Sequence, residues 1–288
     1  LISRASGDGP GGNANSGLID AVAIVIGGIP VGAPAISDDG NLIAFTSNAS
    51  NLVPGDSNGV ADVFVRNVSE GTTTRVSVDA AGGELTQPSG DPAISGDGNR
   101  VAFVTLAAID PQDTNNRNDV YLRDLAAGTT TLISRRGIGA PAGNDSSTQP
   151  ALDADGSHVA FASVSTDLAP AAVNDVDPND PDVWLVDVAD GVPKLINRNA
   201  GDNTPPIDTS NQGAAEPALD ADGDTIAFSS ASTNLGATGD LPGTDVFVQD
   251  VTTGATELVS RTATTPSVSG NGTSVAPAID AAGQRVAF

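Results

Sequence analysis

The stretch PAISDDGNLIAFTSNASNLVPGDSNGVADVFVRNVSEGTTTRVSV, which spans Pro34–Val78, decides the fold because the chain repeats it. Its opening, Pro-Ala-(Ile/Leu)-(Ser/Asp), recurs at steps of 58, 58, 67 and 60 residues. The copies of this opening begin at Pro34, Pro92, Pro150, Pro217 and Pro277. A recurrence at this spacing indicates a repeat architecture.

Three further anchors recur in a constant order within each copy. A (Val/Ile)-Ala-Phe triplet ends at Phe45, Phe103, Phe161, Phe228 and Phe288. An Asp-Val-aromatic triplet places its ring at Phe64, Tyr121, Trp184 and Phe247. A Ser/Asn-Arg pair closes the copy at Arg4, Arg135, Arg198 and Arg261, with Val78 in that place in one copy. We expect the equivalent rings to pack in a core, and the arginines to pair with acids on an outer strand.

Each copy predicts four short β-strands, because apolar and polar residues alternate between Gly-, Asn-, Asp- and Pro-rich turns. In the first copy we expect strands over Ala33–Ser37, Leu42–Ser47, Asp62–Asn67 and Thr73–Val78. No segment carries an apolar stripe with a helical period, so we expect helices to be nearly absent.

A four-stranded antiparallel unit repeated in tandem cannot bury both faces alone, whereas radial packing of the copies buries them against each other. The predicted fold class is therefore all-β, a β-propeller of four-stranded antiparallel blades. The pattern P-A-I-S-x-D-G-x-x-(I/V)-A-F, followed by D-V-F-V and T-x-x-x-(V/I)-S-R, resembles the WD40-like propeller repeat of TolB-type proteins. This resemblance covers nearly the whole chain. It implies partner binding in the cell envelope, although such repeats also occur in scaffolds and enzyme accessory domains.

We expect a single domain over residues 1–288, with complete blades at about 33–79, 91–136, 150–199 and 217–261 and partial blades at 1–5 and 276–288. The chain opens on the fourth strand of a blade and stops on a second strand. We therefore expect it to be part of a longer chain, with about six or seven blades in the intact propeller.

The chain is strongly acidic, with 12 Lys and Arg against 36 Asp and Glu and a formal net charge of −24. This charge argues against nucleic-acid binding and against docking on an anionic membrane. No apolar run reaches the roughly 20 residues of a membrane span. Cysteine is absent, which excludes disulfides and fits a secreted bacterial protein. We expect an extracellular, periplasmic or cell-surface location.

Residues 17–32 depart from the repeat and contain the apolar run Ala21–Ile26. One interpretation is an extra strand that covers a sheet edge. The other is an exposed hydrophobic contact for a partner, which includes self-association with a second copy of the chain.

The long loops between second and third strands share one face of the predicted propeller with the blade connectors, and such loops often bind ligands. Acids and amides in three of these loops are spaced as in part of a Ca²⁺ loop. The candidate metal ligands are Asp56, Asn58, Asp62, Asp113, Asn115, Asp119, Asp175, Asp177 and Asp182. The alternative is Asx-turns, with the last Asp bonded to backbone ahead of the third strand. Calcium is the one cofactor to which the sequence points.

The sequence offers little for catalysis. His158 is the one histidine, and we expect it to be a surface residue of a strand beside a turn. No Gly-x-Ser-x-Gly nucleophile elbow occurs. The recurrent Asp-Gly pairs, and the acids that precede a glycine by four residues, are typical of turns. The pairs begin at Asp39, Asp97, Asp155 and Asp222, and the other acids are Asp124, Asp187 and Asp250.

We therefore predict a non-catalytic interaction scaffold of a secreted or cell-envelope bacterial protein, which binds a protein partner through its acidic long-loop face. One alternative is the accessory propeller of a prolyl-oligopeptidase-like hydrolase whose catalytic domain lies outside this chain. Another is a structural subunit of a surface layer or filament, in which the Ala21–Ile26 run and the unpaired terminal half-blades contact a neighbouring chain.

Overall fold

The structure is a computed structural model. It describes residues 2–6, 11–14, 25–26, 29–30, 32–168, 173–174, 180–197, 207–208, 212–235, 243–263 and 268–288. The regular structure in these residues is β-strand, and no helix occurs among them, as predicted. The described part of the chain therefore contains no helix that is long and apolar enough to cross a membrane.

Four antiparallel sheets of four strands each form the complete blades. Blade 1 consists of β3 (Ala35–Ile36), β4 (Leu42–Ser47), β5 (Asp62–Asn67) and β6 (Thr72–Arg75). Blade 2 consists of β7 (Ser89–Ile94), β8 (Arg100–Thr105), β9 (Asp119–Asp124) and β10 (Thr129–Leu132). Blade 3 consists of β11 (Ser147–Leu152), β12 (His158–Ser163), β14 (Asp182–Asp187) and β15 (Pro193–Leu195). Blade 4 consists of β17 (Ala214–Leu219), β18 (Thr225–Ser230), β19 (Asp245–Asp250) and β20 (Thr256–Leu258).

Among the described residues, three two-stranded sheets accompany the blades. The pair β21 (Ala278–Ile279) and β22 (Val286–Ala287) repeats the first half of a blade beside blade 4. The pair β1 (Val25–Ile26) and β2 (Ile29–Pro30) lies next to β7. A parallel pair joins β13 (Val173–Asn174) to β16 (Ile207–Asp208).

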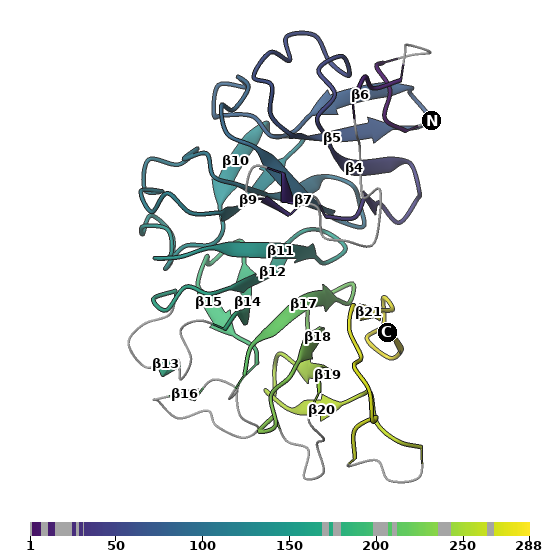
Figure 1. Ribbon diagram of the computed structural model, residues 1–288, viewed down its shortest axis with the longest axis vertical. Helices are drawn as coiled ribbons and strands as arrows, with labels where there is room; N and C mark the ends of the chain where they lie inside the picture. Colours follow the sequence, from purple (N-terminus) through teal and green to yellow (C-terminus); the bar gives the residue numbers. More distant parts are fainter. Residues whose placement is uncertain are drawn as a thin grey trace.

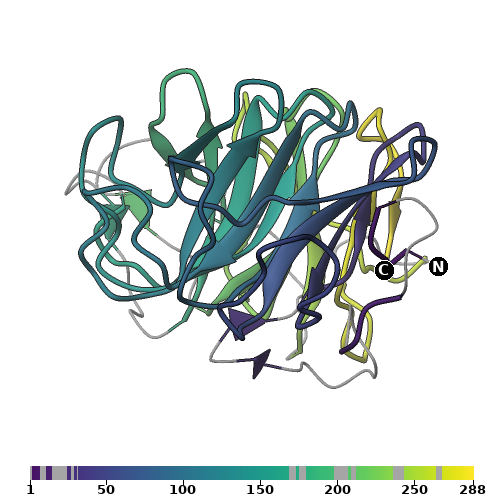
Figure 2. The ribbon, with the colours of Figure 1, turned by 90° about the horizontal axis from the view of Figure 1, so that it is seen from above.

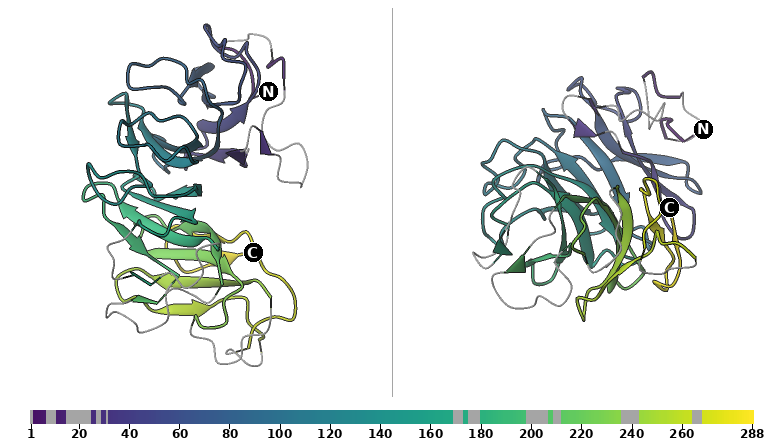
Figure 3. Two further views of the ribbon diagram at one scale, coloured as in Figure 1. Left: turned by 60° about the vertical axis from the view of Figure 1, so that its left-hand side comes forward. Right: turned by 60° about the horizontal axis from the view of Figure 1, so that its bottom comes forward.

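The blades follow one another in a curved row, from blade 1 near the N-terminus to blade 4 and the half-blade near the C-terminus (Figure 1). The curvature is plain in the left view of Figure 3, where both chain ends lie on the same side of the row. Seen from above, the sheets stand beside one another and their strands run from one face to the other (Figure 2). This is the predicted propeller arrangement, in which sheet packs on sheet.

The core lies between neighbouring sheets and is built from the predicted anchors. Within three blades the ring of the second strand stacks on the ring of the third. The pairs are Phe45 with Phe64 at 5.8 Å, Phe103 with Tyr121 at 6.2 Å, and Phe228 with Phe247 at 5.9 Å between ring centroids. Trp184 lies opposite Phe161 in the third blade and is buried as well. The prediction that these rings pack in the core is confirmed.

The first strands of blades 2, 3 and 4 begin two to three residues earlier than predicted, at Ser89, Ser147 and Ala214 rather than at 91, 150 and 217. The reason is a β-bulge in each strand, between Gly90 and Ala93 in the first case, so that the proline lies inside the strand instead of starting it. Proline has no N–H to give to a ladder, so within a sheet it is tolerated at such a bulge.

The turn predictions are confirmed. Asp39 accepts hydrogen bonds from the Ser37 hydroxyl at 2.6 Å and from the N–H of Asn41 at 2.9 Å, and Gly40 follows with a φ of 71°. The equivalent glycines Gly98, Gly156 and Gly223 have φ between 69° and 74°. The 3–4 hairpins close as expected too, because the Gly128 N–H donates to the Asp124 carbonyl at 3.0 Å.

The N-terminal segment packs on blade 1 as the end of blade 2 packs on blade 3. The N–H of Gly12 donates to the Ser3 carbonyl at 2.8 Å, just as Gly143 donates to Ser134 at 3.0 Å. The apolar run predicted at Ala21–Ile26 is described only at its end: Val25–Ile26 pairs with Ile29–Pro30, and residues 21–24 lie outside the described residues. In that pair β2 contacts β7, which is the inner edge strand of the blade 2 sheet.

Neighbouring blades interlock at the Asp-Gly turns. A Cβ on Gly156 would lie 2.9 Å from the Cβ of Arg100, which starts the second strand of the preceding blade. In the same way Leu42 abuts Gly98, His158 abuts Gly223 and Thr225 abuts Gly283. The glycine is therefore needed twice, for its positive φ and for the room that a missing side chain leaves.

Replacing Gly156 by Ala is expected to lower the free energy of unfolding by roughly 2 to 3 kcal/mol, because a φ of 69° and the contact with Arg100 both oppose a Cβ. Gly139 is the matched control: its φ is 72°, but a Cβ there would meet nothing within 4 Å. Gly139→Ala should cost only about 1 kcal/mol. Urea unfolding of both variants measures the difference, and equal losses would contradict the interlock.

Candidate functional site

In the long loop of blade 1 an arginine lies among the predicted metal ligands. Nη1 of Arg75, from β6, lies 3.6 Å from Oδ1 of Asp56, 3.5 Å from Oδ2 of Asp62 and 3.1 Å from Oε2 of Glu84. The side chains of Arg75 and Asp62 are 10% and 0% exposed. Asn58 bridges the loop, since its amide donates to Asp62 at 3.0 Å and to the Leu85 carbonyl at 2.9 Å. The guanidinium thus takes the place where a cation would bind.

The same contacts shift the acidity of the carboxyl groups. Loss of water on burial raises the pKa of Asp56 and of Asp62, while Arg75 opposes the rise at both. The pKa of Glu84 falls to about 2, first because the Ser57 hydroxyl and N–H donate to it and also because Arg75 pairs with it. The cluster therefore holds three carboxyl groups around one positive charge.

In blade 2 a tyrosine hydroxyl, not an arginine, bonds the buried carboxyl group of the long loop. Leu132 replaces Arg75 in register, and Tyr121 replaces Phe64 opposite it. The Tyr121 hydroxyl donates to Oδ2 of Asp113 at 2.6 Å. Asn115 donates to Asp119 at 2.8 Å, as Asn58 does to Asp62. Both carboxylates are buried, and burial raises the pKa of Asp113 and raises that of Asp119 to about 7.

The predicted Asx-turns form at Asn58 and Asn115, whose side-chain oxygens accept the N–H groups of Val60 and Arg117 at 3.0 Å and 2.7 Å. The last acid of each loop makes a different contact, to a side chain, that the blades share. This acid accepts a hydrogen bond from a Ser or Asn side chain just past the fourth strand. The oxygen of that Ser or Asn side chain in turn accepts the N–H of the Val that follows the acid. The pairs are Ser77 with Asp62 at 2.7 Å, Ser134 with Asp119 at 2.6 Å, Asn197 with Asp182 at 2.6 Å and Ser260 with Asp245 at 2.6 Å. This link fastens the loop end to the outer strand in every complete blade.

These contacts bear on the predicted calcium site. In the loops of blades 1 and 2 a Ca²⁺ ion would have to displace Arg75 or break the bond between Tyr121 and Asp113. The donor sets there do not fit an open oxygen cage. Asp175 and Asp177 lie outside the described residues, so calcium in that loop stays a prediction. On the face opposite the long loops, carboxyl oxygens of three further acids lie within 4.8 Å of one another. These acids are Asp220, Asp222 and Asp224.

The five Pro-Ala anchors line one cavity of about 630 Å³ on the inner side of the blades. Its walls are Pro, Ala, Ile and Leu, and its polar residues are those that precede a proline: Asp91, Gln149 and Glu216. Each of these three has a positive φ, between 53° and 56°. The sequence does carry a signal for them, a polar residue before the anchor in three copies, but a pattern within one copy does not show that this residue bonds the next blade.

The three residues join the blades in series. The N–H of Gln149 donates to Oδ2 of Asp91 at 2.8 Å, and the N–H of Glu216 donates to Oε1 of Gln149 at 3.1 Å. The N–H of Ala276 donates to Oε2 of Glu216 at 2.7 Å. A side chain in one blade thus satisfies the backbone of the next, and the N–H groups of Gln149 and Glu216 lie within the bulges of their strands.

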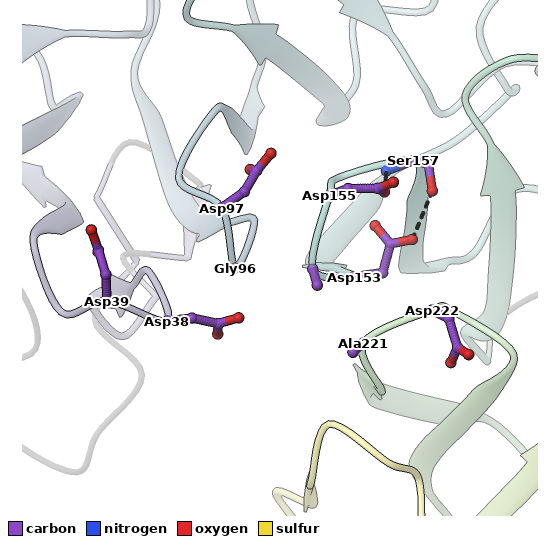
Figure 4. A pocket seen from close by; sticks show the side chains of 10 residues that line it. Asp38, Asp39, Gly96, Asp97, Asp153, Asp155, Ser157, Ala221 and Asp222 are labelled. Carbon is purple, nitrogen blue, oxygen red and sulfur yellow. Dashed lines mark hydrogen bonds between the residues drawn. The ribbon is translucent and has the colours of Figure 1, made fainter.

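The other end of these strands opens into an acidic mouth of about 600 Å³. Carboxyl groups from the 1–2 turns of four neighbouring blades surround it (Figure 4). They belong to Asp38, Asp39, Asp97, Asp153, Asp155 and Asp222. Of the described residues that line the mouth, none is basic. Hydrogen bonds from Ser37 and from Ser157 lower the pKa of Asp39 and of Asp155, so these two groups are carboxylates near neutral pH.

His158 lies beside this mouth and is half-buried between blades 3 and 4, not on the open surface as predicted. Its Nδ1 lies 2.7 Å from Oδ2 of Asp153, and the Ser157 hydroxyl donates to the same oxygen at 2.9 Å. The bond to Asp153 is the main cause that raises the pKa of His158. Ser157 lies 3.2 Å from Nδ1 of His158, the nitrogen that faces the carboxylate, whereas a serine nucleophile gives its proton to the nitrogen that faces away from the carboxylate.

The recurrent arginines differ from their prediction in part. Arg261 pairs with Glu257 on the outer strand β20, as expected. Arg135 instead lies 3.0 Å from Asp110 in the long loop of its own blade. Arg198 lies outside the described residues.

Comparison with solved structures shows likeness to TolB from Acinetobacter baumannii, with a TM-score of 0.52, 19% identity and coverage of 88% of this chain and 47% of that one. The chain has a TolB-like β-propeller fold. A TolB from Agrobacterium tumefaciens follows with a TM-score of 0.48 and 18% identity over 83% of this chain and 66% of that one. Dipeptidyl peptidase 4 from Porphyromonas gingivalis has a TM-score of 0.46 and 17% identity, with coverage of 90% of this chain and 34% of that one.

No family model and no curated protein matches this sequence. The TolB-like propeller described here spans about half the length of the Acinetobacter protein. At these identities the likeness concerns the fold alone, because one propeller fold serves many unrelated functions.

Replacing Arg75 by Leu, the residue at this position in blade 2, should lower the free energy of unfolding by about 3 kcal/mol, because Asp56, Asp62 and Glu84 lose their buried counter-charge. Arg117→Leu is the control: Arg117 and Asp145 are 54% and 43% exposed, and their pair is worth less than about 1 kcal/mol. Adding Phe64→Tyr and Glu84→Ala to Arg75→Leu copies blade 2 and should restore part of the loss. Urea unfolding measures all three, and a loss no larger than the control's would contradict the role of Arg75.

The buried carboxyl of Asp119 should make stability depend on pH. Its pKa rises from 3.8 to about 7 on folding, so the folded state holds the proton more tightly. The resulting stability is complete below about pH 4 and is lost as pH rises through 7. Asp119→Asn should reduce the fall in unfolding free energy between pH 5 and pH 8. The control is Asp190→Asn, in an exposed hairpin turn, which should leave the decrease in unfolding free energy as in the wild type. An unchanged decrease in Asp119→Asn would contradict the prediction.

Proposed function

We propose that this propeller is a non-catalytic interaction module of a secreted or cell-envelope protein, and that it holds a cationic segment of a protein partner at the acidic mouth of its inner channel. The observation that carries the proposal is the mouth itself, a concavity of about 600 Å³ ringed by carboxylates from four blades. Concave sites with converging polar groups are where ligands bind most often.

Charge determines the kind of partner. The chain has a net charge of −24, and the mouth adds a local concentration of carboxylates without a basic side chain among the described residues that line it. Such a surface attracts Lys- and Arg-bearing segments and repels acidic ones. The apolar walls of the adjoining cavity offer contacts to the flanking residues of such a segment. The TolB-like resemblance supports a partner in the cell envelope.

Two observations support a contact at the mouth over one at the long-loop face. The carboxylates of the blade 1 and blade 2 loops are already bonded to Arg75 and Tyr121. By contrast, Asp38 and Asp222 at the mouth are exposed, and neither makes a side-chain hydrogen bond within the described part of the chain. Calcium is not needed for this contact. The bonding of Ser157 and His158 to one carboxylate supports a binding role without catalysis.

The test is binding of a nine-residue arginine-rich peptide, measured by calorimetry at low and moderate salt. Asp38→Asn/Asp222→Asn should weaken binding about fivefold, because two rim charges are each worth up to about 1 kcal/mol. Glu70→Gln/Asp190→Asn removes the same charge from exposed hairpin turns and should leave the affinity nearly unchanged. Equal weakening by both pairs would show non-specific attraction and overturn the site, as would absence of binding to the wild-type protein.

A further inference from the structure

The bonds that join the inner ends of the blades differ in chemistry from one joint to the next. The acceptor between blades 2 and 3 is a carboxylate, that of Asp91. The acceptor between blades 3 and 4 is the amide oxygen of Gln149, which does not titrate. The acceptor beyond blade 4 is the carboxylate of Glu216, which receives a second hydrogen bond from the Ser229 hydroxyl at 2.8 Å. Equivalent positions thus carry a titratable and a permanently neutral version of one joint.

Asp91 is partly exposed where it lines the inner cavity, but one side of its carboxyl group is covered by backbone and no counter-charge faces it. A Cβ on Gly32 would lie 2.6 Å from its Oδ1, so the backbone at Gly32 closes over the carboxylate. The N–H of Gln149 is its one hydrogen-bond donor in the described part of the chain. No described residue packed against it carries a charge that affects its ionisation, and the other titratable residue lining the cavity is Glu216, two blades along.

These surroundings favour the neutral acid. Burial raises the pKa of Asp91 to about 6, and the N–H of Gln149 offsets only part of the rise. The sign follows: the folded chain holds this proton more tightly than the unfolded chain, so the related stability is complete below about pH 4 and is lost as pH rises through 6. The hydrogen bond from the Gln149 N–H to Asp91 changes in the opposite sense and becomes stronger as pH rises, because a hydrogen bond to a charged acceptor is roughly twice as strong as one to a neutral acceptor.

We propose that Asp91 is a proton-sensitive joint between blades 2 and 3, whose bond to the N–H of Gln149 tightens when the carboxyl ionises and loosens when it takes up a proton. The next joint, between Gln149 and Glu216, does not respond. Since Asp91 and Gln149 both line the inner cavity, the joint changes the grip between two walls of that cavity in weakly acidic surroundings.

The amide signals of the chain give a direct test. In a nitrogen–proton NMR titration from pH 4.5 to pH 8, the Gln149 amide should shift with a midpoint near pH 6. The Glu216 amide is the matched control within the same molecule, because its acceptor is Gln149, and it should show no transition at that pH. Asp91→Asn should abolish the Gln149 transition. A midpoint below pH 5, or a transition near pH 6 that survives Asp91→Asn, would overturn the proposal.

A second variant keeps the test independent of whether Asp91→Asn folds. Gln149→Glu puts a carboxylate into the silent joint, so the Glu216 amide should gain a transition that the wild-type chain lacks between pH 5 and pH 7. If the Glu216 amide stays unchanged in the folded variant, the bond between joint acceptor and amide does not report ionisation, and the proposal fails.

Discussion

The hydrogen bond from the residue before an inner proline to a side chain of the preceding blade, made ahead of Pro150, Pro217 and Pro277, is the constraint on which the arrangement depends. Proline gives no N–H to its sheet, and a bulge interrupts the ladder around the N–H that precedes Pro150 and Pro217. Asp91, Gln149 and Glu216 supply the partner of the preceding N–H from the neighbouring blade. At the far end of the same strands the turns are linked through backbone, as in the bond from Asp97 N–H to the Ala154 carbonyl. Neighbouring blades are thus held at both ends of their inner strands.

The copies differ more in their long loops than in these contacts between inner strands. Blade 1 neutralises its carboxylates with Arg75, and blade 2 bonds the corresponding group with Tyr121. The exchange takes place at two positions that face each other across one pair of strands, so that each blade holds one donor suited to its loop. The link from Ser or Asn to the last acid is common to all four complete blades, which indicates that it belongs to the framework.

The sequence was sufficient for the fold because each level of the pattern agreed. The aromatic anchors, the Asp-Gly turns and the period of about sixty residues all point to stacked four-stranded sheets. It was insufficient for the loops, because Arg75 reaches Asp56 from a strand nineteen positions away and no spacing rule connects them. The role of the pre-proline residues is not predictable from one copy of the repeat, because each bonds a backbone group about sixty residues away, in the next blade. Function is less readable still, because it depends on surface chemistry rather than on the repeat.

The contact between a bare glycine and the side chain that opens the preceding second strand has an evolutionary consequence. Each blade offers the same hollow on one side and a side chain on the other, and that side chain differs from copy to copy, as Leu42, Arg100, His158 and Thr225 show. A duplicated repeat inserted between any two blades would therefore meet a hollow ready to receive it. The contact therefore tolerates a change of the side chain that enters the hollow, whereas the glycine that forms the hollow is common to these copies.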